Sequence, residues 1–389
     1  MKVEQLTAFH IRIPLKKAIK HASHTRTETD NVLICCVLKD GSVGFGEGVP
    51  REYVTGESID SVMDLLEQSQ VQSQLGHPQS FDEALEMIEK VSLKPIPGDD
   101  RKCQGNAARC ALELALLDAY GHCFGEPLTS VTQKLAPELY EFVPWVRYSG
   151  AITSAKGFKA RLAAWKMRIF RFKQIKLKVG IEGYDDVKRL KSIRRRVGKK
   201  MDIRIDANEA WSPSETAQRI QELEPFGITS VEQPVKHEEV ESLASIREQV
   251  QTPIMLDESL CSMVDAERSL EKKTCDLFNI RLSKCGGFIP SLRLAQFAQQ
   301  NNLGYQLGCQ VGETAVLSAA GRHFATSVQG IRYLEGSYDR HRAKESLATE
   351  DITFKWGGWG KALIASGLGV AVGADALERV QDRRVDLIA

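Results

Sequence analysis

The sequence predicts an α/β protein in which a parallel β/α barrel follows a smaller N-terminal α+β domain. From residue 142 onward, eight short β-rich runs alternate with helix-length amphipathic segments, a rhythm typical of a barrel. Before that point the strand patterns come first and the helical patterns follow, which favours an α+β domain. In addition, charged residues fall at the C-terminal ends of several predicted barrel strands, where the active sites of this fold lie.

The N-terminal α+β domain is expected over residues 1–130. Alternating apolar residues predict strands within 3–15 and 30–50, and "KDGS" supplies a hairpin turn. Apolar residues at helical spacing then predict three helices, over 58–70, 80–91 and 105–125.

The barrel is expected over residues 131–360. The predicted strands lie within 142–150, 172–180, 201–208, 228–234, 252–259, 276–287, 303–313 and 330–337. Amphipathic segments such as 184–198, 212–227 and 289–302 predict the helices between them. An open doubly wound sheet is the alternative, but no G-x-G-x-x-G follows the first strand. The Gly-rich stretch 360–381 has strand character, and residues 361–389 are expected to return to the first domain.

The composition excludes several classes of function. Lys and Arg (52) nearly balance Asp and Glu (51), so a net charge of +1 gives no overall field for nucleic acid or an anionic membrane. The N-terminus lacks the apolar core of a secretory signal, and no run of about 18 apolar residues occurs. The nine cysteines show no C-x-x-C spacing, which favours reduced thiols in a cytoplasmic protein.

Three acids follow three consecutive predicted strands. Asp206, Glu232 and Asp257 are spaced 26 and 25 residues apart, about one β/α unit each, so they should converge at the C-terminal mouth of the barrel. Such acids would repel one another unless a cation compensates their charge. A set of oxygen ligands without His or Cys favours Mg²⁺, with Mn²⁺ as the alternative. Each acid alone is more often a helix cap, but three successive strand ends are hard to explain by capping.

Three lysines complete this pattern. Lys176 and Lys178 lie on one face of the second strand of the barrel, and Lys284 closes the sixth. Strands two and six lie on opposite sides of an eight-stranded barrel, so Lys178 and Lys284 should face each other across the metal. A lysine beside a divalent cation and a second lysine has a lowered pKa and can act as a base. Lys176 should help to keep Lys178 neutral and bind a substrate carboxylate.

The K-x-K of "IKLKVG", followed by "DAN", "EQP", "LDES" and the lysine of "LSKCGG", resembles the enolase superfamily and its muconate lactonizing enzyme subgroup. The resemblance covers the whole chain. It implies a modified (β/α)7β TIM barrel capped by the N-terminal domain, with Mg²⁺ on Asp206, Glu232 and Asp257. It also implies Lys178 and Lys284 as the acid/base pair, Lys176 as their helper, and a homo-oligomer, either a dimer or an octamer.

The expected chemistry is removal of the proton α to a substrate carboxylate, with an ene-diolate held by the metal and Lys176. A lysine on each face allows racemisation or epimerisation, and N-acyl amino acids are the favoured substrates. A muconate-type cycloisomerase, an o-succinylbenzoate synthase and a dipeptide epimerase remain alternatives. The mandelate racemase branch is disfavoured, because no His ends the seventh strand. Dipeptide epimerases of this subgroup carry an Asp-x-Asp at the eighth strand, and "YLEGS" departs from it.

The resemblance implies that substrate selection lies in the segments 21–29, 49–58, 145–150, 308–313 and 333–341. The candidate substrate-binding residues within them are Tyr53, His24, Arg26, Arg147, Glu313 and Glu335. Tyr53 and His24 would close over the ligand and exclude water. Arg147 and Arg26 would pair with a second substrate anion. Glu313 either caps the helix after the seventh strand or forms hydrogen bonds within the site.

Overall fold

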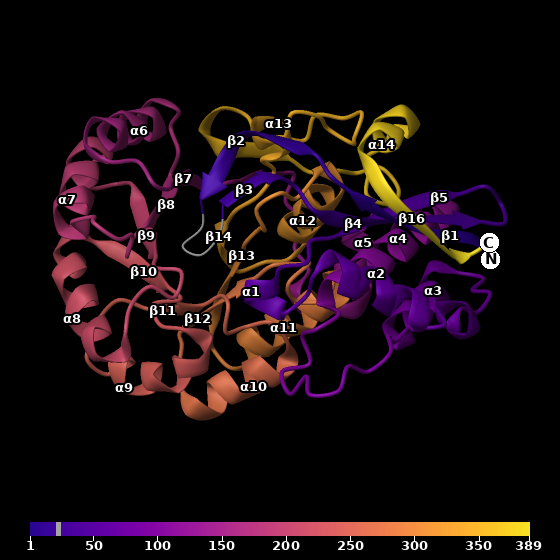
Figure 1. The fold of residues 1–389 in the computed structure, drawn as a ribbon, viewed down its shortest axis with the longest axis horizontal. Helices are drawn as coiled ribbons and strands as arrows, with labels where there is room; N and C mark the ends of the chain where they lie inside the picture. The colour runs from indigo at the N-terminus through magenta and orange to yellow at the C-terminus, as the bar shows by residue number, and fades with distance from the viewer. Residues whose placement is uncertain (21–24) are drawn as a thin grey trace.

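The computed structural model describes residues 1–20 and 25–389. The chain forms two parts (Figure 1). One is an N-terminal sheet with the helices that pack on it, and the other is a barrel. Among the described residues, none of the helices combines the length and the apolarity that crossing a bilayer requires. In this part of the chain all nine cysteines are free thiols.

The N-terminal sheet is antiparallel, in the order β16-β1-β4-β5. Its strands are β1 (Val3–Ile11), β4 (Asn31–Leu38), β5 (Val43–Gly48) and β16 (Gln381–Ile388). A separate hairpin joins β2 (Pro14–Lys20) to β3 (Thr25–Glu28). The helices of this part are α1 (Glu52–Thr55), α2 (Ile59–Gln68), α3 (Phe81–Lys90), α4 (Asn106–Phe124) and α5 (Thr129–Leu135). The sheet therefore contains the last strand of the chain beside the first.

The strand β5 and the helix α4 approach each other closely, because β5 carries glycine at every second position. A Cβ atom at Gly46 would lie 2.0 Å from the backbone oxygen of Ala111, and one at Gly48 would lie 2.0 Å from that of Ala107. Glycine is needed where two backbones come this close. This contact fixes the position of Glu47, which lies between the two glycines and reaches the barrel.

The barrel sheet is parallel throughout and runs in sequence order from β7 to β14. Its strands are β7 (Gly150–Ile152), β8 (Gln174–Lys178), β9 (Asp202–Asp206), β10 (Ile228–Glu232), β11 (Ile254–Leu256), β12 (Leu277–Ile280), β13 (Gly304–Leu307) and β14 (Ile331–Leu334). The Ser149 N–H donates to the Leu334 carbonyl at 2.8 Å, which joins the two ends of the sheet.

A helix follows each of the first seven barrel strands, and these helices form the outer layer (Figure 1). They are α6 (Gly157–Ile169), α7 (Asp186–Val197), α8 (Pro213–Leu223), α9 (Leu243–Arg247), α10 (Met263–Lys272), α11 (Phe288–Gln300) and α12 (Ala315–Ser327). Only the short α13 (Asp339–Arg342) follows the eighth strand. The (β/α)7β architecture expected from the resemblance is thus confirmed.

Three strand predictions are wrong in detail. Residues 3–15 form two strands, since Pro14 has no N–H with which to continue the β1 ladder and begins β2 instead. Within 142–150, β6 (Trp145–Arg147) pairs antiparallel with β15 (Trp359–Lys361), and the barrel strand starts only at Gly150. The stretch 360–381 is mostly irregular before α14 (Ala374–Val380), and the strand that joins the N-terminal sheet is β16.

Candidate active site

The two lysines of β8 point into the C-terminal mouth of the barrel, and both line a cavity there. The Lys178 ammonium donates to the side-chain oxygen of Asn208 at 2.6 Å. The Lys176 ammonium is buried and forms ion pairs with three carboxylates, at 3.3 Å to Asp206, 3.2 Å to Glu232 and 2.9 Å to Glu335. The alternation of the strand therefore directs both charges to one face, as the sequence predicts.

The three predicted metal ligands converge at this mouth. Asp206 and Glu232 are the last residues of β9 and β10, Asp257 directly follows β11, and all three are buried. The Arg281 guanidinium contacts both Asp257 and Glu232. Lys176 joins Glu232 to Asp206 in the same way. Among the described residues, no group of three or more His, Cys, Asp or Glu side chains is gathered closely enough to hold a metal ion directly.

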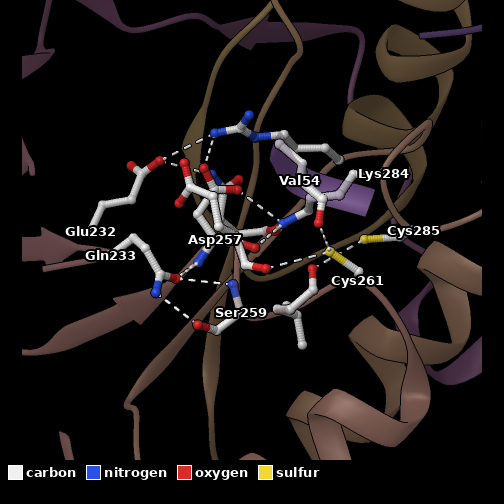
Figure 2. Close-up of polar contacts among 12 residues, drawn as sticks. Val54, Glu232, Gln233, Asp257, Ser259, Cys261, Lys284 and Cys285 are labelled. Carbon is white, nitrogen blue, oxygen red and sulfur yellow. Dashed lines mark hydrogen bonds and ion pairs between the residues drawn. The ribbon is translucent and has the colours of Figure 1, made fainter. Parts of the chain in front are cut away.

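Lys284 lies four residues beyond the end of β12, and its side chain is fully buried. The ammonium donates to the Asp257 carboxylate at 2.9 Å and to the Asp257 and Asn279 carbonyls at 2.7 and 2.8 Å (Figure 2). In the sheet order, β12 is four strands from β8, so Lys284 and Lys178 come from opposite sides of the barrel. Lys178 lines the cavity, whereas Lys284 is not among the described residues that line it.

The turn that carries Asp257 is held by Gln233, the glutamine of "EQP". Its side-chain oxygen accepts hydrogen bonds from the Asp257 and Ser259 N–H groups at 2.9 and 3.1 Å, and its amide donates to the Ser259 hydroxyl at 2.7 Å (Figure 2). The two acid motifs "EQP" and "LDES" are thereby locked together, which keeps Asp257 directed at the mouth.

At Lys176 and Lys284, burial and the neighbouring charges shift the pKa in opposite directions. Burial by itself lowers the pKa of Lys176, but the Glu232, Glu335 and Asp206 carboxylates outweigh it and hold that pKa well above its usual value. Burial lowers the pKa of Lys284 too, and Asp257 reverses the effect and raises it. The charged group beside Lys284 in the structure is the Asp257 carboxylate, at 2.9 Å, so the lowering of this pKa by a neighbouring cation stays a prediction.

The acids are shifted in both directions. Burial raises the pKa of Glu232 to about 7, although Lys176 opposes the shift. Burial and the adjacent Asp257 raise the pKa of Glu258 well above its usual range, and its buried Oε2 has no hydrogen-bond partner in the described part of the chain. The mouth thus holds more carboxyl groups than the side chains of Lys176, Arg281 and Lys284 pair with. This surplus of oxygen donors fits a hard divalent cation.

Three of the predicted substrate-binding residues line the cavity: Tyr53, Glu313 and Glu335. Tyr53 lies in α1, at the edge of the N-terminal domain. Glu313 does not cap α12, since the Thr314 hydroxyl accepts the Val316 N–H in that role. It accepts the Gln310 N–H instead, and burial raises its pKa to about 8. Glu313 is therefore a group of the cavity wall.

Arg147 is not brought to this cavity. It lies in β6, where its guanidinium donates to the Gly357 carbonyl at 2.8 Å and stacks over Trp359 at 4.9 Å. The sequence prediction placed it at the end of a barrel strand because the run 142–150 was read as one strand. The backbone of Arg26 lies in β3, paired with Ile19, and His24 falls outside the described residues.

The structure adds residues that the sequence reasoning did not single out. Arg281, Asn208 and Glu258 line the cavity. Asn208 and Glu258 belong to the motifs "DAN" and "LDES", so their positions two and one residues after a metal-ligand candidate were a usable signal. Arg281 comes just after β12, and its position three residues before Lys284 pointed to the same mouth. Arg51 also lines the cavity, and it lies in the predicted substrate-selecting segment 49–58, although it was not singled out there.

The N-terminal domain is tied to the mouth through Glu47 of β5. Its buried carboxylate accepts the Thr314 hydroxyl at 2.7 Å, the Leu317 N–H at 2.9 Å and the Asn31 amide at 2.7 Å. Burial outweighs these hydrogen bonds and raises its pKa to about 7. Thr314 and Leu317 begin α12, directly after the loop that carries Glu313. The N-terminal domain thus holds one wall of the cavity in place.

Comparison with known proteins agrees with this geometry. A family described as "Enolase C-terminal domain-like" matches residues 158–376, more than half of the chain. The chain is 31% identical to an L-Ala-D/L-Glu epimerase of Clostridium acetobutylicum, over 86% of this chain and 89% of that protein. It is 28% identical to an N-succinyl-L-Arg/Lys racemase of Bacillus cereus, over 86% of this chain and 87% of that one.

Solved structures show the same fold along the whole chain. The N-succinyl Arg/Lys racemase from Bacillus cereus superposes with a TM-score of 0.86 at 25% identity, covering 99% of this chain and all of that one. A dipeptide epimerase from Cytophaga hutchinsonii, complexed with Mg and the dipeptide D-Ala-L-Val, superposes with a TM-score of 0.83 at 25% identity, with full coverage of both chains. This chain therefore belongs to the enolase superfamily, as an isomerase related to racemases and epimerases.

Proposed function

We propose that this protein racemises or epimerises N-acyl amino acids by moving the proton α to the substrate carboxylate between Lys178 and Lys284. The observation that carries the proposal is the placement of these two lysines on β8 and after β12, on opposite sides of a mouth lined by buried carboxylates. Two groups on opposite faces of one carbon can remove a proton from one side and return it on the other.

The surplus of carboxyl oxygens at the mouth supports a divalent cation, Mg²⁺ by preference, held by Asp206, Glu232 and Asp257. When bound, the cation would supply positive charge for the substrate carboxylate and for the negative charge that develops on it in the reaction. Lys176, which already contacts Asp206 and Glu232, adds a fixed positive charge beside the same position.

The proton transfers are then the work of two side chains. Lys178 reaches the cavity, and its hydrogen bond to Asn208 holds the ammonium in one orientation. Lys284 is held by Asp257 and by two backbone carbonyls on the opposite side of the barrel, from which it would meet the other face of the substrate. For one enantiomer Lys178 takes the proton and Lys284 returns one, and for the other enantiomer the roles exchange.

The ion pairs of Glu335 support a substrate that carries an N-acyl group rather than a free amine. Lys176 and Arg204 both contact this carboxylate, and although burial opposes them, they lower its pKa to about 2. Its charge is thus already matched within the protein, which leaves it poorly suited to hold a substrate ammonium group. The cavity wall also carries the basic side chains Arg51, Arg281 and Arg342. These favour a substrate that is anionic overall.

Dipeptide epimerisation is the second candidate, because several relatives carry that name, among them a hydrophobic dipeptide epimerase of Enterococcus faecalis at 30% identity. In this case Glu313, whose carboxyl group lines the cavity and accepts the Gln310 N–H, would hold the substrate ammonium. Replacing Glu313 by Gln would then remove turnover of dipeptides and spare that of N-acyl amino acids.

The proposal is tested by α-proton exchange in D₂O with Mg²⁺, followed by proton NMR. The panel holds N-succinyl and N-acetyl amino acids, dipeptides, muconate and succinylbenzoate precursors. With N-succinyl amino acids, Lys178→Ala and Lys284→Ala should each lose exchange of one enantiomer by roughly 10²–10⁴-fold. Lys188→Ala, at an exposed lysine of α7, is the matched control.

Turnover of muconate to a lactone without exchange of any amino-acid substrate would contradict racemisation and favour a cycloisomerase. Exchange of dipeptides alone would contradict the N-acyl substrate class but keep the two-lysine mechanism. Exchange that survives in both lysine variants would contradict the mechanism itself.

A further inference from the structure

The helix α6 carries an apolar stripe on its solvent side. Phe158, Leu162, Trp165 and Ile169 are 69%, 45%, 50% and 54% exposed. Their spacing of four, three and four residues places them in a single row along the helix. The buried residues of α6 are only Ala160 and Ala164, which lie on the opposite side and pack toward the barrel.

Basic side chains flank this stripe on both sides. At 100° per residue, Lys159 and Lys166 lie along one border of the row, and Arg161 and Arg168 lie along the other. All four are exposed. The charge of this region is strongly one-sided, because no Asp or Glu occurs between Glu141 and Glu182, a stretch with ten Lys and Arg residues. Two of the ten, Lys176 and Lys178, point into the barrel mouth, and the four that border the stripe are exposed on α6.

A second observation extends the same surface. Phe170 follows α6 and packs against Trp356 with ring centroids 4.6 Å apart, and both side chains are exposed. Beside them opens a cleft that also contains Trp359. Its described wall includes five basic side chains and no acidic one: Arg147, Arg168, Arg171, Lys173 and Lys200. The cleft is separate from the active-site cavity, with which it shares no lining residue in the described part of the chain.

We propose that the apolar stripe of α6 and the adjoining basic cleft form a docking surface for an anionic lipid bilayer. An exposed row of Phe, Leu, Trp and Ile bordered by Lys and Arg matches a helix that lies in the bilayer interface, with its rings among the acyl chains and its basic groups at the phosphates. The cleft would receive a phosphate-bearing headgroup. This surface is independent of the proposed racemase activity.

The shape of the surface favours a bilayer over another protein. In Figure 1, α6 lies at the outer edge of the barrel, far from the N-terminal sheet, and the side chains of the stripe are exposed. A bilayer can accept an exposed helical row along its whole length, whereas a protein partner would need a groove of matching shape. Pairing with the same face of a second copy would bring like charges together, which opposes association.

The test is co-sedimentation with vesicles of phosphatidylcholine alone or with about 30% phosphatidylglycerol, at low and high salt. The protein should bind the anionic vesicles, and binding should weaken with salt because the Debye length shortens. Leu162→Ser/Trp165→Ser should lose about tenfold or more in vesicle partitioning, since the anchoring row is interrupted. Ile364→Ser is the matched control, because Ile364 is 74% exposed and lies outside the surface.

The electrostatic part is tested separately. Lys159→Glu/Lys166→Glu should lose binding to anionic vesicles by a similar factor, while Lys90→Glu, a charge reversal on the exposed side of α3, should not. Absence of binding to anionic vesicles, or equal binding by the Leu162→Ser/Trp165→Ser variant, would overturn the proposal. Self-association in sedimentation velocity that this variant abolishes, with no vesicle binding, would overturn it in favour of a subunit interface.

Discussion

Arg204 is a fully buried arginine whose charge is matched inside the barrel. It lies on β9, contacts the Glu335 carboxylate, donates to the Ser149 hydroxyl at 3.1 Å and stacks over Tyr333 at 4.9 Å. Because Glu335 also contacts Lys176, Arg204 acts on the site through another residue. It holds Glu335 in place, and Glu335 in turn holds the Lys176 ammonium beside the acids.

We predict that Arg204→Met destabilises the fold by about 3–5 kcal/mol, because it leaves Glu335 buried with one positive partner fewer. The double variant Arg204→Met/Glu335→Leu should recover a large part of this loss, since the uncompensated charge is then removed. Urea unfolding measures both. Equal losses in the single and double variants would show that packing, and not charge, explains the role of Arg204.

His323 predicts a pH dependence of stability. It is buried in α12 with its Nε2 3.0 Å from the Leu368 carbonyl, and burial lowers its pKa to about 4. Between pH 6.5 and 4 the unfolded chain binds a proton here that the folded chain does not, so acidification destabilises the folded state. At about 1.4 kcal/mol per pH unit, this amounts to roughly 3 kcal/mol over the whole range.

Urea unfolding at pH 7 and pH 4.5 checks this value, with His323→Gln as the comparison, because glutamine can still donate to the carbonyl. The wild type should lose about 2–3 kcal/mol more than the variant on acidification. The carboxyl groups titrate in both proteins, so they cancel in the comparison. The same slope in the two proteins would contradict the assignment to His323.

At the scale of elements, the packing of α4 on β5 depends on backbone contact. Gly46→Ala would place a Cβ atom 2.0 Å from the Ala111 oxygen and 2.4 Å from the Ala115 nitrogen. Backbone atoms of a buried helix cannot move aside cheaply, so we predict a loss of about 3 kcal/mol or more. Gly76→Ala is the control, since its nearest atom is the Met87 sulfur at 3.9 Å.

Thermal unfolding of the two glycine variants is the measurement. Gly46→Ala should unfold at a clearly lower temperature and should also lose activity, because β5 carries Glu47 to the cavity wall. A variant as stable as the wild type would mean that α4 can shift away from the sheet without cost.

At the scale of the whole molecule, the N-terminal domain and the barrel complete one site, which neither contains alone. The barrel provides the lysines and carboxylates, while Arg51 and Tyr53 close the cavity from the other domain. A ligand that binds between two domains stabilises the folded chain through linkage. The melting temperature is therefore a readout of the proposed cation and substrate together.

We predict that Mg²⁺ with an N-succinyl amino acid raises the melting temperature, corresponding to about 2.7 kcal/mol when the ligand is present at about 100 times its Kd. Asp206→Asn should abolish the increment that Mg²⁺ adds, because one charged ligand is lost. Differential scanning fluorimetry measures both. An unchanged increment in the variant would contradict the assignment of Asp206 as a ligand.

The net charge of the whole chain does not show how positive and negative charges are distributed along it. The balance of Lys and Arg against Asp and Glu argued against an anionic membrane. The folded chain nevertheless places four basic side chains of the acid-free stretch 142–181 in the cleft beside α6, namely Arg147, Arg168, Arg171 and Lys173. A total cannot describe such segregation, and the order of charges along the sequence was the signal that could have revealed it.

The sequence by itself determined the barrel, its eight strands and the strand-end acids and lysines, because periodicity and spacing are local properties. Only the tertiary structure decided which strands pair outside the barrel and which side chains meet. It paired β6 with β15 and so removed Arg147 from the site, and it brought Arg281 onto Glu232 and Asp257. Pairing and contact depend on segments far apart in the chain, and no local pattern encodes their distance in space.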